Sequence, residues 1–250
     1  MKIISWNING IRAINGKGFL GWLEKSGGDV VCLQEIKATE DKIPAELKNP
    51  AGYFSYFNPA QRPGYSGVAV YTRHQPLEVI NKIGFKQFDE EGRILRLEYP
   101  DFILINVYMP NGGQSAEALD YKLEVYEYLL EYLGKIKKKP VVIVGDFNVA
   151  REEIDLARPK ENQNSIMFTP PEREKLDKLV KLGFVDSWRY FYPTEKKYTW
   201  WHYFSQSRIR NIGWRIDCAF VSPALAPKLK GAEIYNEIIG SDHCPIEVEI

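Results

Sequence analysis

The sequence predicts an α/β fold in which two β-sheets pack face to face and helices cover their outer sides. Apolar runs rich in β-branched residues alternate with helical patterns along the whole chain. Some of these runs, such as PVVIVGD (140–146), are continuously apolar, as in strands that helices cover. The strand candidates also outnumber the helix candidates, which favours two packed sheets over one.

Each predicted element rests on the period of its apolar residues. Strands are predicted at 2–6, 29–34, 67–72, 93–99, 102–109, 140–146, 217–221 and 245–250, and helices at 17–26, 116–138 and 171–183. The apolar stripe of the longest helix is formed by Leu119, Leu123, Tyr126, Leu130 and Leu133. Pro170 and Pro171 before the third helix, and Gly183 after it, bracket that helix in the usual sense.

Length and composition indicate an ordinary globular protein. The 250 residues are 44% apolar and 26% charged, which suffices to bury most of the apolar surface, and no linker or repeat divides them. We therefore interpret residues 1–250 as a single domain and expect a monomer. No run of about 18 apolar residues indicates a membrane span. The N-terminal MKIISWN lacks the features of a signal peptide, so we expect a cytoplasmic protein.

Neither the net charge nor the cysteines point to a partner. Basic and acidic residues number 33 each, so there is no overall attraction to nucleic acid. The KIKKK run (135–139) is interpreted as the solvated end of a helix. Cys32, Cys218 and Cys244 are widely spaced within apolar runs. This argues against disulfides or a zinc site and predicts small buried residues.

Polar side chains follow the apolar strands repeatedly, at the point where each strand ends. Open α/β sheets bind ligands outside the carboxyl ends of their strands, so we expect these side chains to converge on one polar site. The residues concerned are Asn7, Glu35, Tyr108, Asn111, Asp146, Asn148, Asp242 and His243.

Most of these residues also have an ordinary structural interpretation. Glu35 is equally well a salt-bridged strand end or a metal ligand. Asp146 and Asn148 lie two apart and face the same side of an extended chain, but an Asp/Asn turn is a common strand ending. His243, next to an aspartate, is the best of the three histidines for acid–base work or phosphate polarisation.

Asp217 opens another strand and has two interpretations. If it reaches His243, it fixes the tautomer of the imidazole and stabilises the imidazolium, as the acid of a catalytic triad does. The alternative is an ion pair with Arg215 on the same strand face. The other histidines are less informative, since His74 lies in a polar turn pattern and His202 within an aromatic run.

Oxygen donors dominate the predicted site. Such a set suits a hard cation, Mg²⁺ before Ca²⁺ or Mn²⁺. The sequence holds no serine or cysteine nucleophile motif, no P-loop and no GxGxxG. What remains is metal-assisted attack of water on a phosphate ester. A carboxylate or histidine takes a proton from the water, while asparagine and tyrosine hold the phosphoryl oxygens.

In these motifs the chain resembles the exonuclease III family of apurinic/apyrimidinic (AP) endonucleases. The matching segments are ISWNINGIRA, LQEIKA, GYSGVAVYT, EGRI, NVYMPNG, GDFNVA, EIDLARPKEN, FVDSWR, YTWW, RNIGWRID and GSDHCPIEVEI. They run from Ile4 to the C-terminus. The resemblance implies a four-layer α/β sandwich, with two packed mixed sheets flanked by helices.

The resemblance also implies an activity. Members cleave the phosphodiester 5′ to an abasic site in duplex DNA with Mg²⁺, for which Mn²⁺ can substitute, and leave a 3′-hydroxyl. Removal of 3′-blocking groups and 3′→5′ exonuclease activity accompany this reaction. By position, Glu35 is implied as the principal metal ligand, with Asn7 and Asp242 close to the metal. Asp146 and Asn148 are implied to position or activate the water and to hold the phosphate.

The remaining polar residues acquire roles in the same way. Tyr108 and Asn111 are implied as phosphate contacts, and Asp217 and His243 as a hydrogen-bonded pair. Whether Asp146 or His243 is the general base stays open.

The stretch YTWWHYF (198–204) is unusual in a chain without net charge. By the resemblance, Trp200 and Trp214 line an apolar pocket that holds an extruded, bare deoxyribose and excludes a base. Phe204 corresponds to a position that probes the DNA groove.

Other residues of this region have simpler roles. Arg208 and Arg210 are expected to contact DNA phosphates, which provides affinity without sequence choice. We expect Trp201 and Tyr203 to be plain core residues.

The chain departs from common family patterns at several positions. Asn9 stands where several members have aspartate, so a carboxylate near the metal is missing. Gln114 stands where some have a groove-inserting arginine, which is expected to weaken product retention, and Arg151 where histidine is frequent. Ile166 and Met167 replace a small residue and a glycine, so the conformation of this DNA-facing loop is open.

Two other functions stay open from the residues alone. The same site would serve a phosphoesterase for a phosphoinositide, sphingomyelin or a nucleotide, although the aromatic and basic stretch would then lack a purpose. The second is a DNA-binding module without catalysis, which the complete set of candidate catalytic residues disfavours. Turnover of a small substrate without DNA incision would reveal the first. DNA binding unchanged by Asp146→Asn, with no cleavage by either protein, would reveal the second.

Overall fold

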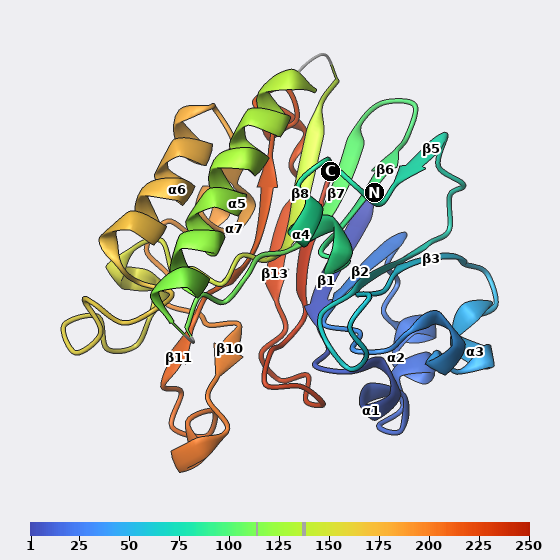
Figure 1. The fold of residues 1–250 in the computed structure, drawn as a ribbon, viewed down its shortest axis with the longest axis horizontal. Helices are drawn as coiled ribbons and strands as arrows, with labels where there is room; N and C mark the ends of the chain where they lie inside the picture. Colours follow the sequence, from blue (N-terminus) through green and yellow to red (C-terminus); the bar gives the residue numbers. More distant parts are fainter. Residues whose placement is uncertain (114, 137–138) are drawn as a thin grey trace.

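Two six-stranded sheets pack face to face, and helices cover the outer side of each (Figure 1). The computed structural model describes residues 1–113, 115–136 and 139–250. This four-layer arrangement confirms the predicted fold class.

The first sheet has the strand order β13-β14-β1-β2-β4-β3. Its strands are β13 (Gly231–Ile234), β14 (Ile246–Glu249), β1 (Lys2–Asn7), β2 (Val30–Gln34), β4 (Val68–Thr72) and β3 (Phe54–Asn58). β1 runs parallel to β2 and antiparallel to β14, so the sheet is mixed.

The second sheet has the order β5-β6-β7-β8-β12-β9. Its strands are β5 (Glu78–Ile80), β6 (Ile94–Glu98), β7 (Ile103–Tyr108), β8 (Val141–Asp146), β12 (Asp217–Val221) and β9 (Val185–Asp186). β7 and β8 are parallel, whereas β12 is antiparallel to β8. A separate two-stranded ribbon of β10 (Trp200–Trp201) and β11 (Gly213–Trp214) extends from one end of the molecule (Figure 1).

Three helices cover each sheet. The first sheet carries α1 (Ile11–Asn15), α2 (Phe19–Lys25) and α3 (Ala45–Lys48), and the second carries α4 (Lys86–Glu90), α5 (Ala116–Lys135) and α6 (Pro170–Lys181). The remaining helical turns are α7 (Ser187–Phe191), η1 (Glu40–Lys42), η2 (Glu153–Asp155), η3 (Phe204–Gln206) and η4 (Ala226–Lys228).

All eight predicted strands and all three predicted helices are confirmed, with ends that differ by a few residues. Lys135 ends α5, and Lys137 and Lys138, which the sequence analysis placed at the end of this helix, lie outside the described residues. The missed elements, such as α1, β5 and β10, have five residues or fewer. Confirmed strands of similar length, such as β2 and β4, are buried throughout, whereas the missed edge strands β3 and β5 are mostly half-buried or exposed and lack a continuous apolar run.

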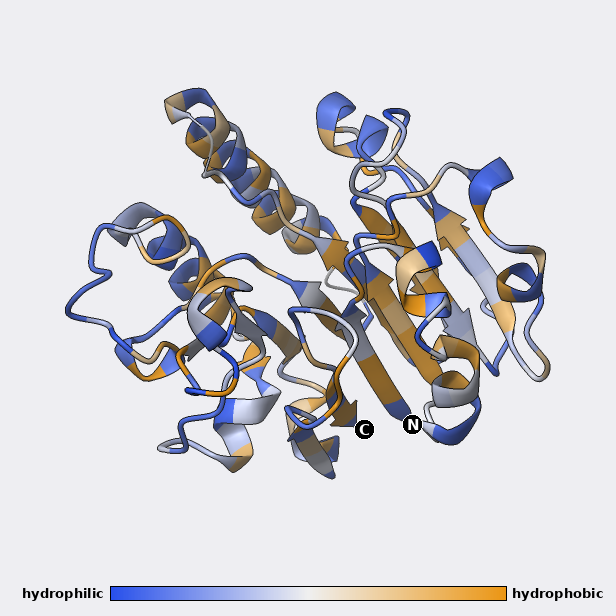
Figure 2. Ribbon diagram, turned by 90° about the horizontal axis from the view of Figure 1, so that it is seen from below, coloured by the Kyte–Doolittle hydropathy of each residue, from blue (hydrophilic) through white to orange (hydrophobic). Residues whose placement is uncertain are grey.

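Alternation along the strands builds three separate layers of core. Ile3 faces the second sheet, where it packs with residues such as Leu104 and Val142, whereas Ile4 faces the helices of its own sheet. Hydrophobic colour accordingly concentrates on the strands, and hydrophilic colour on the outer helices and loops (Figure 2). The three cysteines are buried and free, as predicted. Among the described residues, no helix combines the length and the apolar character that a membrane crossing requires.

The register of the strands brings polar ends to one edge of the paired sheets. Tyr108 of β7 is the partner of Asp146 of β8, and Asp146 is in turn the partner of Asp217 on β12. In the other sheet Asn7 pairs with Gln34, the residue before Glu35. Because β12 is antiparallel, Asp217 reaches this edge from the start of its strand.

Candidate active site

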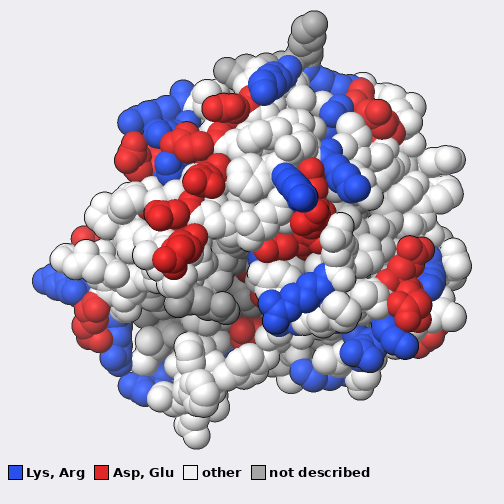
Figure 3. Space-filling model, viewed as in Figure 1, with Lys and Arg blue, Asp and Glu red and all other residues white. Residues whose placement is uncertain are grey.

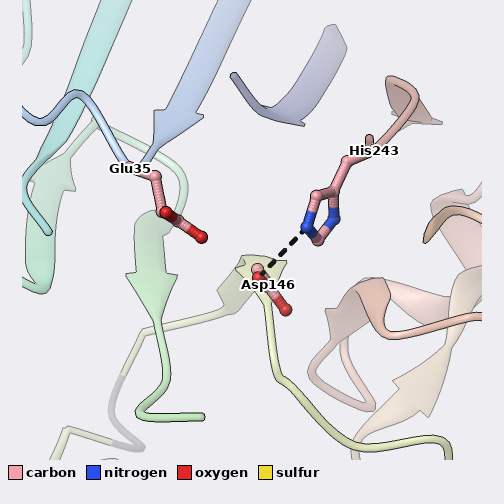
Figure 4. A group of neighbouring side chains, drawn as sticks. All are labelled: Glu35, Asp146 and His243. Carbon is pink, nitrogen blue, oxygen red and sulfur yellow. Dashed lines mark ion pairs between the residues drawn. The ribbon is translucent and has the colours of Figure 1, made fainter. Parts of the chain in front are cut away.

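Three ionisable side chains from distant segments form the centre of this edge (Figure 4). Glu35 directly follows β2, Asp146 ends β8 and His243 precedes β14. One ligand atom of each lies within 4.8 Å of the others; Asp146 and His243 are buried and Glu35 is half-buried. The convergence of strand ends predicted from the sequence is therefore present.

Asn7 joins the two sheets at this centre. Its Nδ2 donates to Glu35 Oε1 and to Asp146 Oδ2, both at 2.9 Å, and its Oδ1 accepts from the backbone N–H of Asn9 at 3.1 Å. The amide therefore orients both carboxylates through its nitrogen, while its oxygen is occupied elsewhere.

Lys37 was missed by the sequence analysis, although it follows Glu35 by two residues. Its Nζ lies 2.6 Å from Glu35 Oε2 and donates to Asn9 Oδ1 at 2.6 Å. Glu35 thus forms a salt bridge, as one interpretation of the sequence proposed, and also belongs to the cluster. Burial alone would raise the pKa of Glu35, but Lys37 and Asn7 lower it below the usual value, so the carboxylate is ionised.

Asp242 lies beside the cluster. Its Oδ1 accepts from Asn9 Nδ2 at 2.9 Å and its Oδ2 from Trp200 Nε1 at 3.0 Å. Asn9, which stands where several members of the family have aspartate, donates to this carboxylate, as a like-charged aspartate would not. Although burial opposes it, His243 together with these donors lowers the pKa of Asp242.

His243 is held from behind by Asp217. Nδ1 of His243 lies 2.8 Å from Asp217 Oδ2, and Nε2 lies 3.9 Å from Asp146 Oδ2. The alternative pairing of Asp217 with Arg215 is not formed, since the Arg215 guanidinium contacts Asp155 and Asp186 instead. The arrangement leaves Nε2 as the imidazole atom that faces the cluster.

Burial and neighbouring charges shift the pKa values of the ionisable groups of the site by different amounts. Burial, followed by the nearby Asp217 carboxylate, raises the pKa of Asp146 to about 7. Burial lowers the pKa of His243, but Asp217 and the other carboxylates outweigh it and raise the pKa to about 10. Burial and Glu35 raise the pKa of Tyr108 well above its usual value, so this phenol stays protonated as a donor.

Asn148 closes a turn directly after Asp146. Its backbone N–H donates to Asp146 Oδ1 at 2.8 Å, and its φ of 52° is left-handed, which asparagine tolerates. The Asp/Asn turn considered from the sequence is therefore formed. Asn148 Nδ2 donates to Met109 O at 2.8 Å, and Asn148 Oδ1 accepts from Asn111 Nδ2 at 3.1 Å. Turn geometry thus places both asparagine amides beside Asp146.

Trp200 and Trp214 form an apolar wall next to the centre. They are partners in the β10–β11 ribbon, with ring centroids 6.5 Å apart. Trp200 lies 6.3 Å from the His243 ring, and Trp214 lies 6.4 Å from Phe168. Both tryptophans pack against a small buried cluster of Ala150, Leu156, Phe168 and Ile216.

The tip of the ribbon differs in part from expectation. Trp201 is a core residue as predicted, but Tyr203 is 68% exposed and the prediction of core packing is wrong. Tyr203 directly precedes η3 in the loop that joins β10 to β11, which projects from the molecule (Figure 1). Phe204 is 74% exposed, as a groove-probing residue requires.

The two arginines of this region have different surroundings. Arg208 stacks on Trp201 and donates to the carbonyls of Ser241, Asn236 and Ile238. Arg210 is exposed and makes a 3.4 Å contact with the Ser205 carbonyl. The Arg208 side chain therefore stabilises the segment before Asp242. The sequence analysis expected a phosphate contact and did not predict this role.

The loop with the unusual sequence SIMF is anchored on both sides. Met167 adopts a left-handed φ of 73°, accepts from Ala150 N–H at 2.8 Å, and places its sulfur 3.6 Å from Asn111 Nδ2. The loop thus places a methionine in the backbone region that favours glycine. Arg151 pairs with Asp177 at 2.9 Å, and Gln114 lies outside the described residues.

The carboxylates of this cluster are oxygen donors, which fit a hard divalent cation, whereas the protonated His243 offers no free nitrogen to a metal. Together with the packed sheets, this cluster defines the class of metal-dependent hydrolases that act on phosphate esters. The chain belongs to the Endonuclease/Exonuclease/phosphatase family, whose sequence pattern matches residues 4–243.

Individual relatives are similar over all or most of their length. The exodeoxyribonuclease of Bacillus subtilis (strain 168) is 44% identical, covering 100% of this chain and 99% of the relative. DNA repair nuclease APEX1 of Danio rerio is 42% identical, covering 98% of this chain and 81% of the relative. The structure of an AP endonuclease from Archaeoglobus fulgidus superposes with a TM-score of 0.91 at 30% identity, covering 100% of this chain and 98% of that one.

Proposed function

We propose that this chain is a DNA-repair endonuclease that hydrolyses the phosphodiester 5′ to abasic sites in duplex DNA with Mg²⁺, leaving a 3′-hydroxyl. The same centre would process 3′-blocked ends and degrade DNA in the 3′→5′ direction. The observation that carries the proposal is the position of Trp200. Its indole donates to Asp242 and lies beside His243, so an apolar wall adjoins the hydrolytic centre. An extruded sugar without a base would pack against such a wall.

Similar proteins support a nucleic-acid substrate over a small phosphoester. The relatives are named as an exodeoxyribonuclease and a DNA repair nuclease, and the similar structure as an AP endonuclease. Charges of both signs are mixed over the surface, and acidic side chains gather over α5 (Figure 3). The acidic surface over α5 would repel a polyanion. We therefore place DNA at the strand-end edge, where Tyr203, Phe204 and Arg210 are exposed.

Each residue of the centre has a part in the proposed reaction. Glu35 would be the principal ligand of the metal, with Asn7 and Asp242 close to it. When bound, the cation would offset phosphate charge and stabilise the leaving oxygen. Asp146, whose pKa burial raises to about 7 in the metal-free site, would accept the proton of the attacking water. His243, which Asp217 keeps protonated, donates from Nε2 to a phosphoryl oxygen.

Neutral donors complete the phosphate site. The Asn148 and Asn111 amides and the Tyr108 hydroxyl lie on the same edge and would bind the remaining phosphoryl oxygens. Turn and strand geometry places these donors, but the asparagine amides now donate to protein groups and would exchange those partners for phosphoryl oxygens.

A labelled duplex with one abasic analogue tests the proposal. We expect incision 5′ to the lesion with Mg²⁺, weaker or equal incision with Mn²⁺, none with EDTA, and none with the Glu35→Ala variant. An undamaged duplex serves as the control. Turnover of a phosphoinositide or nucleotide by a protein that leaves the abasic duplex intact would overturn the choice of substrate. Tight binding of that duplex without cleavage would indicate a non-catalytic module.

Three further features remain predictions. The core that both sheets share supports the interpretation of residues 1–250 as one domain. A monomer and a cytoplasmic location are expected as before. Sedimentation and fractionation of cells would test them.

A further inference from the structure

A charged pair lies fully buried behind the phosphate side of the site. Lys122 of α5 and Glu172 of α6 both have 0% side-chain exposure, and they form an ion pair. Neither residue belongs to the cluster around Glu35 and Asp146. We propose that Lys122 is a positioning residue that holds the loops of Asn111 and Asn148 in their reactive arrangement.

The ammonium group has three protons and three partners. Besides Glu172, Lys122 Nζ donates to the backbone carbonyl of Asn111 at 3.0 Å and to that of Asn148 at 2.7 Å. Every donor of the ammonium is therefore used. The two carbonyls belong to the residues whose side-chain amides face the phosphate site.

Glu172 connects a third loop to the same pair. Its Oε1 accepts from Met167 N–H at 3.0 Å, and its Oε2 accepts from Thr169 N–H at 3.0 Å and from Thr169 Oγ1 at 2.6 Å. The pair thus fixes the loop after β7, the turn after β8 and the loop before α6. These are the three segments that surround the Asn111–Asn148 hydrogen bond.

Close packing places the backbone after Asn111 against the Lys122 side chain. A Cβ at Gly112 would lie 2.9 Å from Lys122 Cδ and 3.5 Å from the Leu119 backbone, and Gly112 itself has a φ of +81°. The backbone after Asn111 therefore lies directly on the lysine stem. A shift of the stem is passed to Asn111 without an intervening flexible side chain.

The pair is poorly explained as a device for stability alone. Buried ion pairs are often replaceable by well-packed apolar residues without loss of stability. The same two helices also form a half-buried pair, Lys175 with Glu127, for which the described contacts include none with the three loops. Misplacing a catalytic contact by about 1 Å lowers the rate roughly 10²-fold. Loss of Lys122 is therefore expected to appear in the chemistry.

The kinetic test rests on the proposed function and compares Lys122→Met with Lys175→Met. We expect Lys122→Met to lower kcat for the abasic duplex by about 10- to 100-fold with KM changed by less than about threefold, since donors to the transition state are displaced. Lys175→Met should leave both constants near wild type. If Lys122→Met does not fold, the double variant Lys122→Met/Glu172→Gln, which leaves no unpaired charge, replaces it.

A second measurement does not depend on the substrate. In ¹⁵N NMR spectra of the metal-free protein, the side-chain amide signals of Asn111 and Asn148 should move in the Lys122 variant and stay in place in Lys175→Met. A folded Lys122 variant with wild-type kcat and unmoved amide signals would overturn the proposal. Failure of wild-type protein to cut the abasic duplex would instead reject the proposed function, and the amide signals would still decide the role of Lys122.

Discussion

Asp217 and His243 form a buried pair, with Oδ2 of the aspartate 2.8 Å from Nδ1 of the imidazole. Asp146 lies on the other side of the ring, 3.9 Å from Nε2, and Asp242 adds a third negative charge nearby. Three carboxylates around one imidazole favour its protonated form. The pair therefore determines which atom of the site carries a proton at neutral pH.

Asp217→Asn is expected to bring the pKa of His243 from about 10 down toward or below the ordinary imidazole value of about 6.5. Because the folded pKa is raised, the stabilisation by the pair is complete below about pH 6.5 and is lost as the pH rises through about 10. NMR titration of the metal-free protein measures the shift. An unchanged His243 titration in the variant would show that Asp217 does not control it.

A second buried network should govern acid stability. Arg215 contacts Asp155 and Asp186 at 2.8 Å, and Arg189 also contacts Asp155. Burial raises the pKa of Asp155, but Arg215 and Arg189 outweigh it, so the pKa is lowered. The contribution of Asp155 is thus present above about pH 4 and is lost as the pH falls through the lowered folded value.

Asp155→Asn should therefore cost about 3–5 kcal/mol of unfolding free energy at pH 7, because one partner of a buried pair is removed. The difference from wild type should shrink below about pH 4. Urea unfolding at pH 7, 5, 4 and 3 measures both effects. A difference that stays constant down to pH 3 would contradict the assigned ionisation.

The left-handed backbone at Met167 predicts that glycine is more stable than alanine at this position, the reverse of the order within a helix. Met167→Gly should be more stable than Met167→Ala by about 1–2 kcal/mol, because a Cβ strains this conformation. At Glu131, exposed within α5, the order should be the opposite, with alanine better by about 1 kcal/mol. Thermal or urea unfolding of the four variants measures these differences in stability. Alanine better than glycine at both positions would argue against a strained loop.

Arg208 and Arg210 should separate into a structural and a DNA-binding residue. Arg208→Ala removes three carbonyl contacts and is expected to lower the unfolding free energy by roughly 1–3 kcal/mol. Arg210→Ala should leave stability unchanged and reduce the slope of log binding constant against log salt by about 1. Fluorescence anisotropy with duplex DNA at several salt concentrations measures the slope. Equal slopes for wild type and Arg210→Ala would exclude Arg210 as a phosphate contact.

Trp200 should determine discrimination for the missing base. Trp200→Ala is expected to lower kcat/KM on the abasic duplex by about 10- to 100-fold, because the apolar wall is lost and Asp242 loses a donor. Trp200→Phe keeps the ring but not the hydrogen bond and should have an intermediate effect. Cleavage rates on abasic and undamaged duplexes give the discrimination ratio. A ratio that survives the alanine substitution would place selectivity elsewhere.

Local patterns were sufficient for the layers and for the candidate centre. The eight apolar strands and the stripe of α5 were predicted because burial of a strand or helix face follows the pattern of its own residues. Glu35, Asp146 and His243 were predicted because strand ends in such sheets meet at one edge. Short elements such as β10 and α1 were missed because they hold too few residues to show a period.

The tertiary structure decided which polar groups meet. Asn7 reaches Asp146 across 139 positions of sequence, Arg215 reaches Asp155 across 60, and Lys122 reaches Glu172 across 50. The exposure of Tyr203 and the hydrogen bonds of Arg208 to backbone carbonyls also depend on neighbours distant in sequence. A period in the sequence records whether a side chain is covered. The partner of a buried charge depends instead on how separate strands and helices are brought together, and that is set only when the whole core has packed.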